Sequence, residues 1–364
     1  MQNGKKVVDN LLRNKKAQRM GTQELIWEDT IRKWIDQGYP KDSEGKPVDY
    51  IQHFDLDMAN IGGWFDLMPL RGHEEIVRET EDWLIKKNGA GASLKFWKNK
   101  SGVPEHIDFT MTSQEIWERD YRKYILDLDT KRVDLDFARK MTKLRNEQDC
   151  WTFYGHLFVF ENLRQSVGDF CLYETVLTNP GWFHDYNRVY TDFFKKHYKY
   201  LFDNVGLPDG IWVYEDMGYK GSLFCSPNVF QELFFPYYRE LIEFFHSYDL
   251  PVVLHSCGYI EQILDMIVDV GFDALNPMEV KAGCDVLRFA EKYADKLAFV
   301  GGLDIRILEG GDKAVIKKEV LRLVNGMKER NARFLFSTDH SVSTAVKYED
   351  YKYALQVFTD NMYY

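Results

Sequence analysis

The sequence predicts an α/β protein whose parallel strands close into a barrel with helices outside. Three observations support this prediction. From about residue 205, five short apolar runs follow one another, amphipathic segments separate them, and each run ends in polar residues. Strands that alternate with helices need crossover connections, which make the strands parallel and place helices on the sheet. Five such units in one half of the chain favour a closed barrel over an open, doubly wound sheet.

Each expected strand is a short run rich in β-branched or aromatic residues. Runs of this kind, bounded by glycine, proline or polar residues, are typical of buried parallel strands. The five runs are GIWVYEDMG at 210–218, PVVLHSCG at 251–258, DALNPME at 273–279, LAFVGGLD at 297–304 and RFLFSTDH at 333–340.

The expected helices carry apolar residues at steps of three and four. Between the runs these segments are NVFQELFFPYYRELIEFFHSYD, IEQILDMIVDVG, DVLRFAEKYAD and AVIKKEVLRLVNGMKERN. In the N-terminal part, LLRNKKAQR at 11–19 and EDTIRKWIDQG at 28–38 predict helices, and residues 83–102 predict a hairpin or extended pair around a glycine-rich turn. We therefore expect one domain over residues 1–364, with a less regular elaboration inside residues 1–140.

The bulk properties exclude several classes of protein. A net charge of −10 and a pI near 5.5 argue against a nucleic-acid-binding protein, which needs clustered Lys and Arg. No apolar run is long enough to span a membrane, and the N-terminal segment lacks the apolar region of a signal peptide, so we expect a cytoplasmic protein. The five cysteines are odd in number and scattered, which predicts reduced thiols that are available as ligands.

Polar side chains follow all five expected strands. In a parallel barrel the carboxyl ends of the strands and the loops after them build the active site, so these side chains are expected to converge. We take the candidates by role: Glu215, Glu279 and Asp304 for catalysis, Asp216, Arg306 and Asp339 for substrate binding, and His255, Cys257 and His340 for a metal ion.

The pair His255 and Cys257 in VVLHSCG has the spacing of half a metal site. On an extended chain residues i and i+2 project to the same side, which aims an imidazole nitrogen and a sulfur at one point. A third ligand from another strand end would complete a zinc site with an open position for substrate. His340 is the first choice for that ligand, and Glu215 and Glu279 are next.

Structural roles stay open for the same residues. A cysteine at a strand end is often simply buried, and a histidine there often bonds the backbone. Asp304 and Asp339 have positions from which a carboxylate caps a following helix. Glu215 and Glu279 lack that explanation, but each could form a buried ion pair with an arginine.

The stretch FCSPNVFQELFFPYYRELIEFFHSYDLPVVLHSCGYIEQILDMIVDVGFDALNPMEV, with the later FVGGLDIRIL and FSTDHSV, resembles the uroporphyrinogen decarboxylase superfamily. The likeness is strongest over residues 205–358 and can be traced through most of the chain. It implies a single (β/α)8 TIM-type barrel. Within the superfamily the chain is more similar to the methyltransferase-like branch. The decarboxylase itself has an arginine-rich signature ending in GRY, and the corresponding QRMGTQELIW here lacks it.

In the corrinoid-dependent methyltransferases of this superfamily, an HxC motif and a later cysteine hold zinc. His255 and Cys257 match the HxC motif, while His340 in STDHSV stands where that family has cysteine. Histidine is a competent zinc ligand, and a site with fewer thiolates is a stronger Lewis acid. The resemblance therefore implies Zn²⁺ but makes coenzyme M a less fitting acceptor.

The leading hypothesis is a methyltransferase that moves a methyl group between a small methylated substrate and the cobalt of a corrinoid. By analogy, methoxylated aromatics are one fitting donor class. The sequence has no corrinoid-binding DxHxxG motif, so the corrinoid is expected on a separate partner protein. Two alternatives stay open: a metal-independent decarboxylase or other lyase, whose pocket should contain more basic than acidic groups, and a non-catalytic barrel that binds a small molecule. We also leave a homodimer open.

Overall fold

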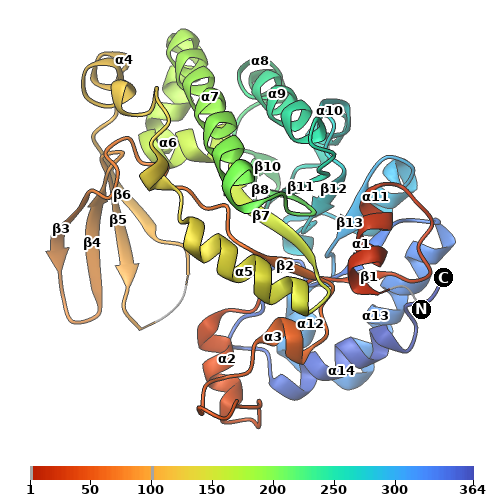
Figure 1. Cartoon of the computed structure of the whole chain (residues 1–364). Coiled ribbons are helices and arrows are strands. Elements are labelled where there is room, and N and C mark those ends of the chain that lie inside the picture. The colour runs from red at the N-terminus through yellow and green to blue at the C-terminus, as the bar shows by residue number, and fades with distance from the viewer. Residues whose placement is uncertain (1–2, 100–101) are drawn as a thin grey trace.

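A central parallel sheet dominates the fold. The computed structural model of the protein describes residues 3–99 and 102–364. Within them eight parallel strands follow the order β1-β14-β13-β12-β11-β8-β7-β2, with helices packed around them (Figure 1). The strands are β1 (Gly21–Thr22), β2 (Met58–Asn60), β7 (Trp151–Leu157), β8 (Gly210–Tyr214), β11 (Val252–His255), β12 (Ala274–Asn276), β13 (Ala298–Val300) and β14 (Phe334–Phe336). The five predicted strands are confirmed as β8 and β11 to β14.

The two edge strands β1 and β2 meet through Asp57, a carboxylate that is only 4% exposed. The Asp57 N–H donates to the Thr22 carbonyl oxygen at 3.2 Å, and the Thr22 N–H donates to Asp57 Oδ2 at 2.9 Å. Arg19 donates to both carboxylate oxygens at 2.7 Å. These contacts nearly close the sheet into a barrel, which confirms the predicted α/β barrel of the TIM type.

The helices of the C-terminal half follow the predicted amphipathic segments. They are α8 (Pro227–Leu233), α9 (Phe235–His246), α10 (Leu264–Val270), α11 (Val286–Tyr293), α12 (Ile305–Gly310), α13 (Lys313–Glu329) and α14 (Tyr348–Thr359). The segment that begins with NVFQEL is not one continuous helix, because it breaks at Phe234, whose φ is −121°. Pro236, which has no N–H to donate, lies at the start of the second helix, as prolines in first turns commonly do.

The first helix lies earlier than predicted. Helix α1 spans Gly4–Leu12 instead of residues 11–19, so that prediction is wrong. The Asn3 side chain accepts a hydrogen bond from the Lys6 N–H at 2.9 Å and caps the helix. Val7, Val8 and Leu11 are buried on one face of α1, whereas the polar stretch after Leu12 offers no apolar face. The second predicted helix is confirmed as α2 (Glu28–Ile35), and the short α3 (Tyr50–His53) follows it.

A separate antiparallel sheet stands beside the barrel, at the left of Figure 1. Its strands run in the order β3 (Glu74–Glu79), β4 (Trp83–Asn88), β5 (Ala92–Trp97) and β6 (Glu105–Phe109). The hairpin expected at 83–102 is confirmed as β4 and β5, although residues 100 and 101 of that segment lie outside the described residues. This sheet and the barrel strands β1 and β2 all come from residues 1–140.

The chain returns to the barrel through further helices. These are α4 (Gln114–Ile116) and α5 (Leu135–Glu147) before β7, and α6 (Val159–Thr178) and α7 (Pro180–Val205) after it. Short helical turns are η1 (Trp117–Tyr121), η2 (Arg122–Tyr124), η3 (Thr130–Arg132), η4 (Glu261–Ile263) and η5 (Val280–Ala282), and a small hairpin of β9 (Gly218–Tyr219) and β10 (Ser222–Leu223) follows β8.

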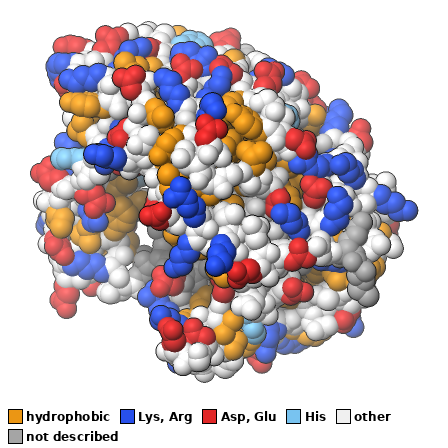
Figure 2. Space-filling model, in the orientation of Figure 1, with side chains coloured by type: hydrophobic (Ala, Val, Ile, Leu, Met, Phe, Trp, Pro, Cys, Tyr) orange, Lys and Arg blue, Asp and Glu red, His pale blue; other side chains and the backbone are white. Residues whose placement is uncertain are grey.

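The surface carries charges of both signs. Figure 2 shows Lys and Arg side chains intermingled with Asp and Glu over the visible face. Across residues 3–99 and 102–364, no helix has the length and apolar character needed to cross a membrane.

Candidate metal centre

Three side chains at the carboxyl ends of β8 and β11 bring a nitrogen, a sulfur and an oxygen together. The Cys257 Sγ lies 3.4 Å from His255 Nε2, and Asp216 Oδ1 lies 3.7 Å from the same nitrogen. In the described part of the chain, Asp216, His255 and Cys257 form a group whose candidate ligand atoms all lie within 4.8 Å of one another. Imidazole, thiolate and carboxylate are the donors that zinc takes in proteins, so this group fits a zinc-type ion.

The loop after β11 holds Cys257 in this place. The Cys257 N–H donates to Asp216 Oδ1 at 2.9 Å, which ties the loop to the end of β8. Gly258 has a φ of +80°, and a Cβ there would clash with the backbone of Gly218 in the β9–β10 hairpin. The Tyr259 N–H then donates to the Tyr219 carbonyl oxygen at 2.9 Å. The glycine after HSC therefore allows the close contact that sets the thiol beside Asp216.

The imidazole of His255 has a fixed neighbour on its other side. His255 Nδ1 lies 2.5 Å from Asn276 Oδ1, and Asn276 Nδ2 donates to the Val300 carbonyl oxygen at 2.8 Å. His255 and Asn276 are paired residues on the adjacent strands β11 and β12. Sequence reasoning missed Asn276, because its importance depends on which residue faces His255 across the sheet.

The electrostatics of the Cys257 thiol favour a bound cation. Burial raises the pKa of Cys257 well above its ordinary value, and the Asp216 and Glu279 carboxylates raise it further. The thiolate is therefore costly here unless a positive charge replaces the proton. A divalent metal ion supplies such a charge, and metal binding at cysteine always releases the thiol proton.

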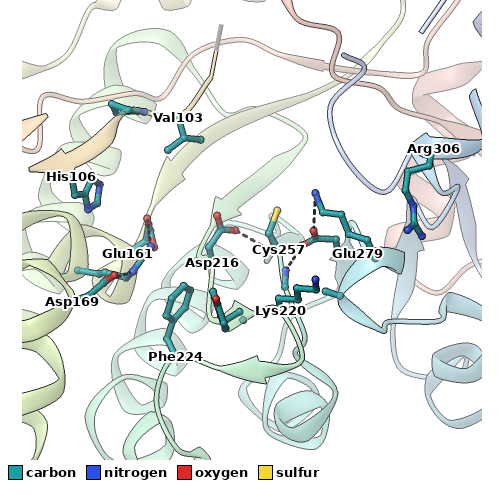
Figure 3. A pocket seen from close by; sticks show the side chains of 17 residues that line it. Val103, His106, Glu161, Asp169, Asp216, Lys220, Phe224, Cys257, Glu279 and Arg306 are labelled. Atoms are coloured by element: carbon teal, nitrogen blue, oxygen red, sulfur yellow. Dashed lines mark hydrogen bonds and ion pairs between the residues drawn. The ribbon is translucent and has the colours of Figure 1, made fainter. Parts of the chain in front are cut away.

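Cys257 and Asp216 line a cavity of about 860 Å³. In Figure 3, Asp216 and Glu279 flank Cys257, while His106 and Glu161 lie to one side and Arg306 to the other. Val103, Pro104 and His106, at the start of β6, form the wall that faces the barrel. The acidic lining residues are Glu161, Asp169, Asp216 and Glu279, and the basic ones are Arg164, Lys220, Lys281 and Arg306. The lyase hypothesis requires more basic than acidic groups in the pocket, and this lining has equal numbers of the two.

A smaller chamber of about 80 Å³ lies inside the barrel next to His255. His340, Tyr214 and Asn276 also line it, and His255 Nε2 lies 3.4 Å from the Sγ of Cys257, which lines the larger cavity. Burial lowers the pKa of His340, which favours the neutral, ligating form of its ring. His340 is nevertheless outside the group of three, where the carboxylate of Asp216 takes the place expected for it.

Two of the predicted acidic residues join the cavity or its edge. Glu279 Oε2 accepts from the Gly258 N–H at 2.7 Å, and its other oxygen lies 3.2 Å from Lys281 Nζ. Asp304 caps α12 by accepting from the Arg306 N–H at 3.0 Å, and it also pairs with the Arg306 guanidinium at 2.6 Å. Glu279 and Arg306 line the cavity, whereas Asp304 holds Arg306.

Asp339 and Glu215 have different surroundings. Asp339 is 1% exposed and accepts from the Val280 and Ile305 N–H groups at 2.8 and 2.9 Å, which ties together the loops after β12 and β13. Burial raises the pKa of Asp339 to about 6. Glu215 is fully buried and accepts from the Phe158 and Phe160 N–H groups at 2.6 and 2.9 Å, at the start of α6.

Glu215 also accepts a hydrogen bond from the Tyr238 hydroxyl, and burial raises the pKa of Glu215 to about 8. Glu215 is not one of the described residues that line the cavity or the chamber. The structure thus separates Glu215 from the other strand-end residues and places it between β8 and α6.

Sequence reasoning also missed a charged cluster on α6. The Arg164 guanidinium lies 4.2 Å from the centre of the Phe224 ring and pairs with Glu161 and Asp169 at 3.1 and 2.8 Å. All four side chains line the cavity. The signal that could have found them is WTFYGHL at 151–157, an apolar and aromatic run like the five that were recognised, with α6 directly after it.

The barrel and the donor group at its mouth define an α/β-barrel protein with a candidate metal centre. The family model described as uroporphyrinogen decarboxylase (URO-D) matches residues 174–360, which is more than half of the chain. The chain belongs to this family, and the resemblance noted in its sequence is confirmed. A search of curated proteins found no match.

Solved structures share this fold. A methyltransferase from Methanosarcina mazei superposes with a TM-score of 0.70 at 14% sequence identity, over 99% of each chain. A putative vitamin-B12-independent methionine synthase from Listeria monocytogenes gives a TM-score of 0.44 at 12% identity, over 94% of this chain and 96% of that one. The first likeness shows that the fold corresponds over nearly the whole chain.

Proposed function

We propose that this protein is a corrinoid-dependent methyltransferase that uses a zinc-type ion. It would move a methyl group between a small methylated substrate and the cobalt of a corrinoid held by a separate protein. The observation that carries the proposal is the donor group of Asp216, His255 and Cys257, of which Asp216 and Cys257 line a cavity of about 860 Å³. The family and the Methanosarcina methyltransferase fold support the same function.

His255 and Cys257 would hold the metal ion, with Asp216 or His340 as the third ligand. Bound there, zinc supplies Lewis acidity toward the oxygen, nitrogen or sulfur that carries the methyl group. The residues fit such an ion, since the Cys257 thiolate needs a positive charge and His255 presents a fixed ring nitrogen.

The other residues would bind the substrate and handle protons. When the methyl group leaves the donor, the electron pair of the broken bond stays on the donor heteroatom, which must then gain a proton. Glu279 lies beside Cys257, and its carboxylate accepts the Gly258 N–H and pairs with Lys281. It is our choice for the group that takes a proton from solvent and passes it to this heteroatom. Arg306, held by Asp304, would orient a polar end of the substrate.

The cavity suits a small organic donor. Its volume lies within the range of about 300–1,000 Å³ that is usual for small-molecule sites. Tyr219 and Phe224 offer aromatic faces along its wall, which supports methoxylated aromatics as a donor class.

The five cysteines are all free in the structure, which supports a reducing compartment such as the cytoplasm.

The sharpest test measures metal content and methyl transfer on the full chain. We expect about one zinc per chain in the wild type and a loss of zinc in Cys257→Ala. Cys225→Ala is the control, because Cys225 is also a free cysteine but is buried outside the donor group. The second assay uses absorption spectroscopy to monitor the methylation of cob(I)alamin by a panel of methoxylated aromatics. We expect the variant that loses zinc to lose this activity as well.

Other outcomes would support the alternatives. A folded wild type that binds no zinc, or a Cys257→Ala variant with full turnover, would refute the metal-dependent transferase and favour a lyase. Release of carbon dioxide from carboxylated substrates would then identify a decarboxylase. A double Glu279→Gln, His340→Ala variant that keeps full ligand affinity, in a protein without turnover, would indicate a non-catalytic binding barrel.

A further inference from the structure

Asn276 links three neighbouring strands at the candidate metal centre. Its Oδ1 meets His255 Nδ1 of β11 at 2.5 Å, and its Nδ2 donates to the Val300 carbonyl oxygen of β13 at 2.8 Å. Asn276 as a residue is only 5% exposed, so water does not compete strongly for either bond. An amide that spans β11, β12 and β13 in this way has little freedom to turn.

The bond to Val300 decides which end of the Asn276 amide faces His255. A backbone carbonyl can only accept, so the NH₂ group of Asn276 must point to Val300. The amide oxygen, which can only accept, therefore points to His255. Nδ1 of His255 must carry the proton of that bond, and in the neutral ring Nε2 is then the nitrogen with the free lone pair.

This free lone pair faces the other donor atoms. His255 Nε2 lies 3.4 Å from Cys257 Sγ and 3.7 Å from Asp216 Oδ1. An imidazole that bonds a protein acceptor through one nitrogen and offers the other to a metal is the usual arrangement of ligating histidines. The sheet therefore provides this tautomer before any metal ion binds.

We propose that Asn276 is the positioning residue of the metal centre, which fixes both the tautomer and the ring orientation of His255. This inference rests on the proposed function in so far as it concerns a metal ion. Without the amide oxygen, the Nδ1 proton would be buried without an acceptor, the other tautomer would gain population, and the ring would rotate more freely.

The test compares variants of the full chain by zinc affinity, measured by competition with a chromophoric chelator at constant pH. Asn276→Ala should weaken zinc binding by about 10–100-fold, the usual effect of losing the acceptor behind a ligating histidine. Asn276→Asp keeps an acceptor for Nδ1 but loses the donor to Val300. We expect it to lower the melting temperature while it largely preserves zinc affinity.

Asn187→Ala is the matched control. Asn187 on α7 is also a fully buried asparagine whose Nδ2 donates to a backbone carbonyl, that of Leu233, at 2.7 Å. Its loss should lower the melting temperature but leave zinc affinity unchanged. Equal losses of zinc affinity in Asn276→Ala and Asn276→Asp, or no loss in a folded Asn276→Ala, would overturn the inference.

A second measurement does not depend on metal binding. In metal-free wild-type protein, ¹⁵N NMR of the histidine side chains should show His255 protonated at Nδ1 and not at Nε2. Asn276→Ala should shift this ring toward a mixture of tautomers. A wild-type ring protonated at Nε2 would refute the role of Asn276, even if zinc binds. Conversely, a wild type with the expected tautomer but no zinc would refute the proposed function and leave the role of Asn276 in orienting the ring intact.

Discussion

Asp216 and His340 reach the His255 and Cys257 pair from different sides. Asp216 lines the outer cavity, whereas His340 lines the inner chamber. Since the Asp216 oxygen already lies among the donor atoms, we expect Asp216→Ala to weaken zinc binding by about tenfold or more. His340→Ala should change the zinc affinity much less. Chelator competition would measure both, and the reverse order would make His340 the third ligand.

His156 of β7 makes stability depend on pH. Its side chain is 0% exposed, and burial lowers its pKa from 6.5 to about 3. Below pH 6.5 the unfolded chain binds a proton at His156 that the folded protein does not bind until about pH 3. The free energy of unfolding should therefore decrease as the pH is lowered from about 6.5 toward about 3. This group contributes a decrease of about 1.4 kcal/mol for each pH unit.

Urea unfolding between pH 7 and pH 4 measures this dependence. In His156→Gln the slope should be smaller, because the glutamine side chain does not titrate. His73→Gln, which alters an exposed histidine just before β3, should keep the wild-type slope. Equal slopes in His156→Gln and the wild type would contradict the assignment.

At the scale of single residues, the sequence predicts the candidate ligands that are neighbours in the chain. His255 and Cys257 could be recognised because the i and i+2 positions of an extended chain share one side. The place of Asp216 in the group could not, since it depends on the hydrogen bond that its carboxylate accepts from the Cys257 N–H. Asn276 required the register between β11 and β12.

At the scale of elements, helix α6 contains a kink on which the four-stranded sheet packs. Gly168 has a φ of +79° inside α6, and a Cβ there would clash with the ring of Phe109 on β6. Gly168→Ala should therefore destabilise the protein by several kcal/mol and loosen β3 to β6 from the barrel. Hydrogen exchange of these strands, with urea unfolding, would measure both effects.

Gly181→Ala is the control for this prediction. Gly181 lies in α7, where an added Cβ would meet only Asn179 Oδ1 at 3.8 Å. Alanine is favoured over glycine inside a helix, so this variant should be neutral or slightly more stable. A Gly168→Ala variant as stable as the control would mean that the kink is not needed for the packing of the sheet.

The length of each element decided whether it could be predicted. Strands β8 and β11 to β14 sit in apolar runs that alternate with long amphipathic helices, so the repeat was visible. Strands β1 and β2 have two and three residues, too few to show any periodicity. The sequence places helix α1 too late, because its cap, Asn3, and its buried residues lie before the basic stretch of the predicted helix.

At the scale of the whole molecule, Asp57 holds the two edges of the barrel together. Its side chain is 5% exposed in the ion pair with Arg19, whose side chain is 15% exposed. Asp57→Ala would leave the Arg19 charge buried and the Thr22 N–H without its acceptor. We expect a loss of about 3–5 kcal/mol in the free energy of unfolding, measured in urea.

Glu44→Ala is a suitable control, because Glu44 forms an exposed ion pair with Lys46. Its effect should stay below about 1 kcal/mol. If Asp57→Ala were as mild as Glu44→Ala, the barrel would be closed by backbone contacts and apolar packing alone.

The four-stranded sheet enters the chain between the paired strands β2 and β7, whereas His255 and Cys257 lie at the end of β11. The wall that faces the donor group and the donor group itself therefore belong to separate stretches of sequence. Evolution could lengthen, shorten or replace that insertion to admit other molecules without disturbing the donor group, since loops on a rigid scaffold tolerate such change. In this barrel, the candidate metal centre and one part of the cavity wall can therefore change independently during evolution.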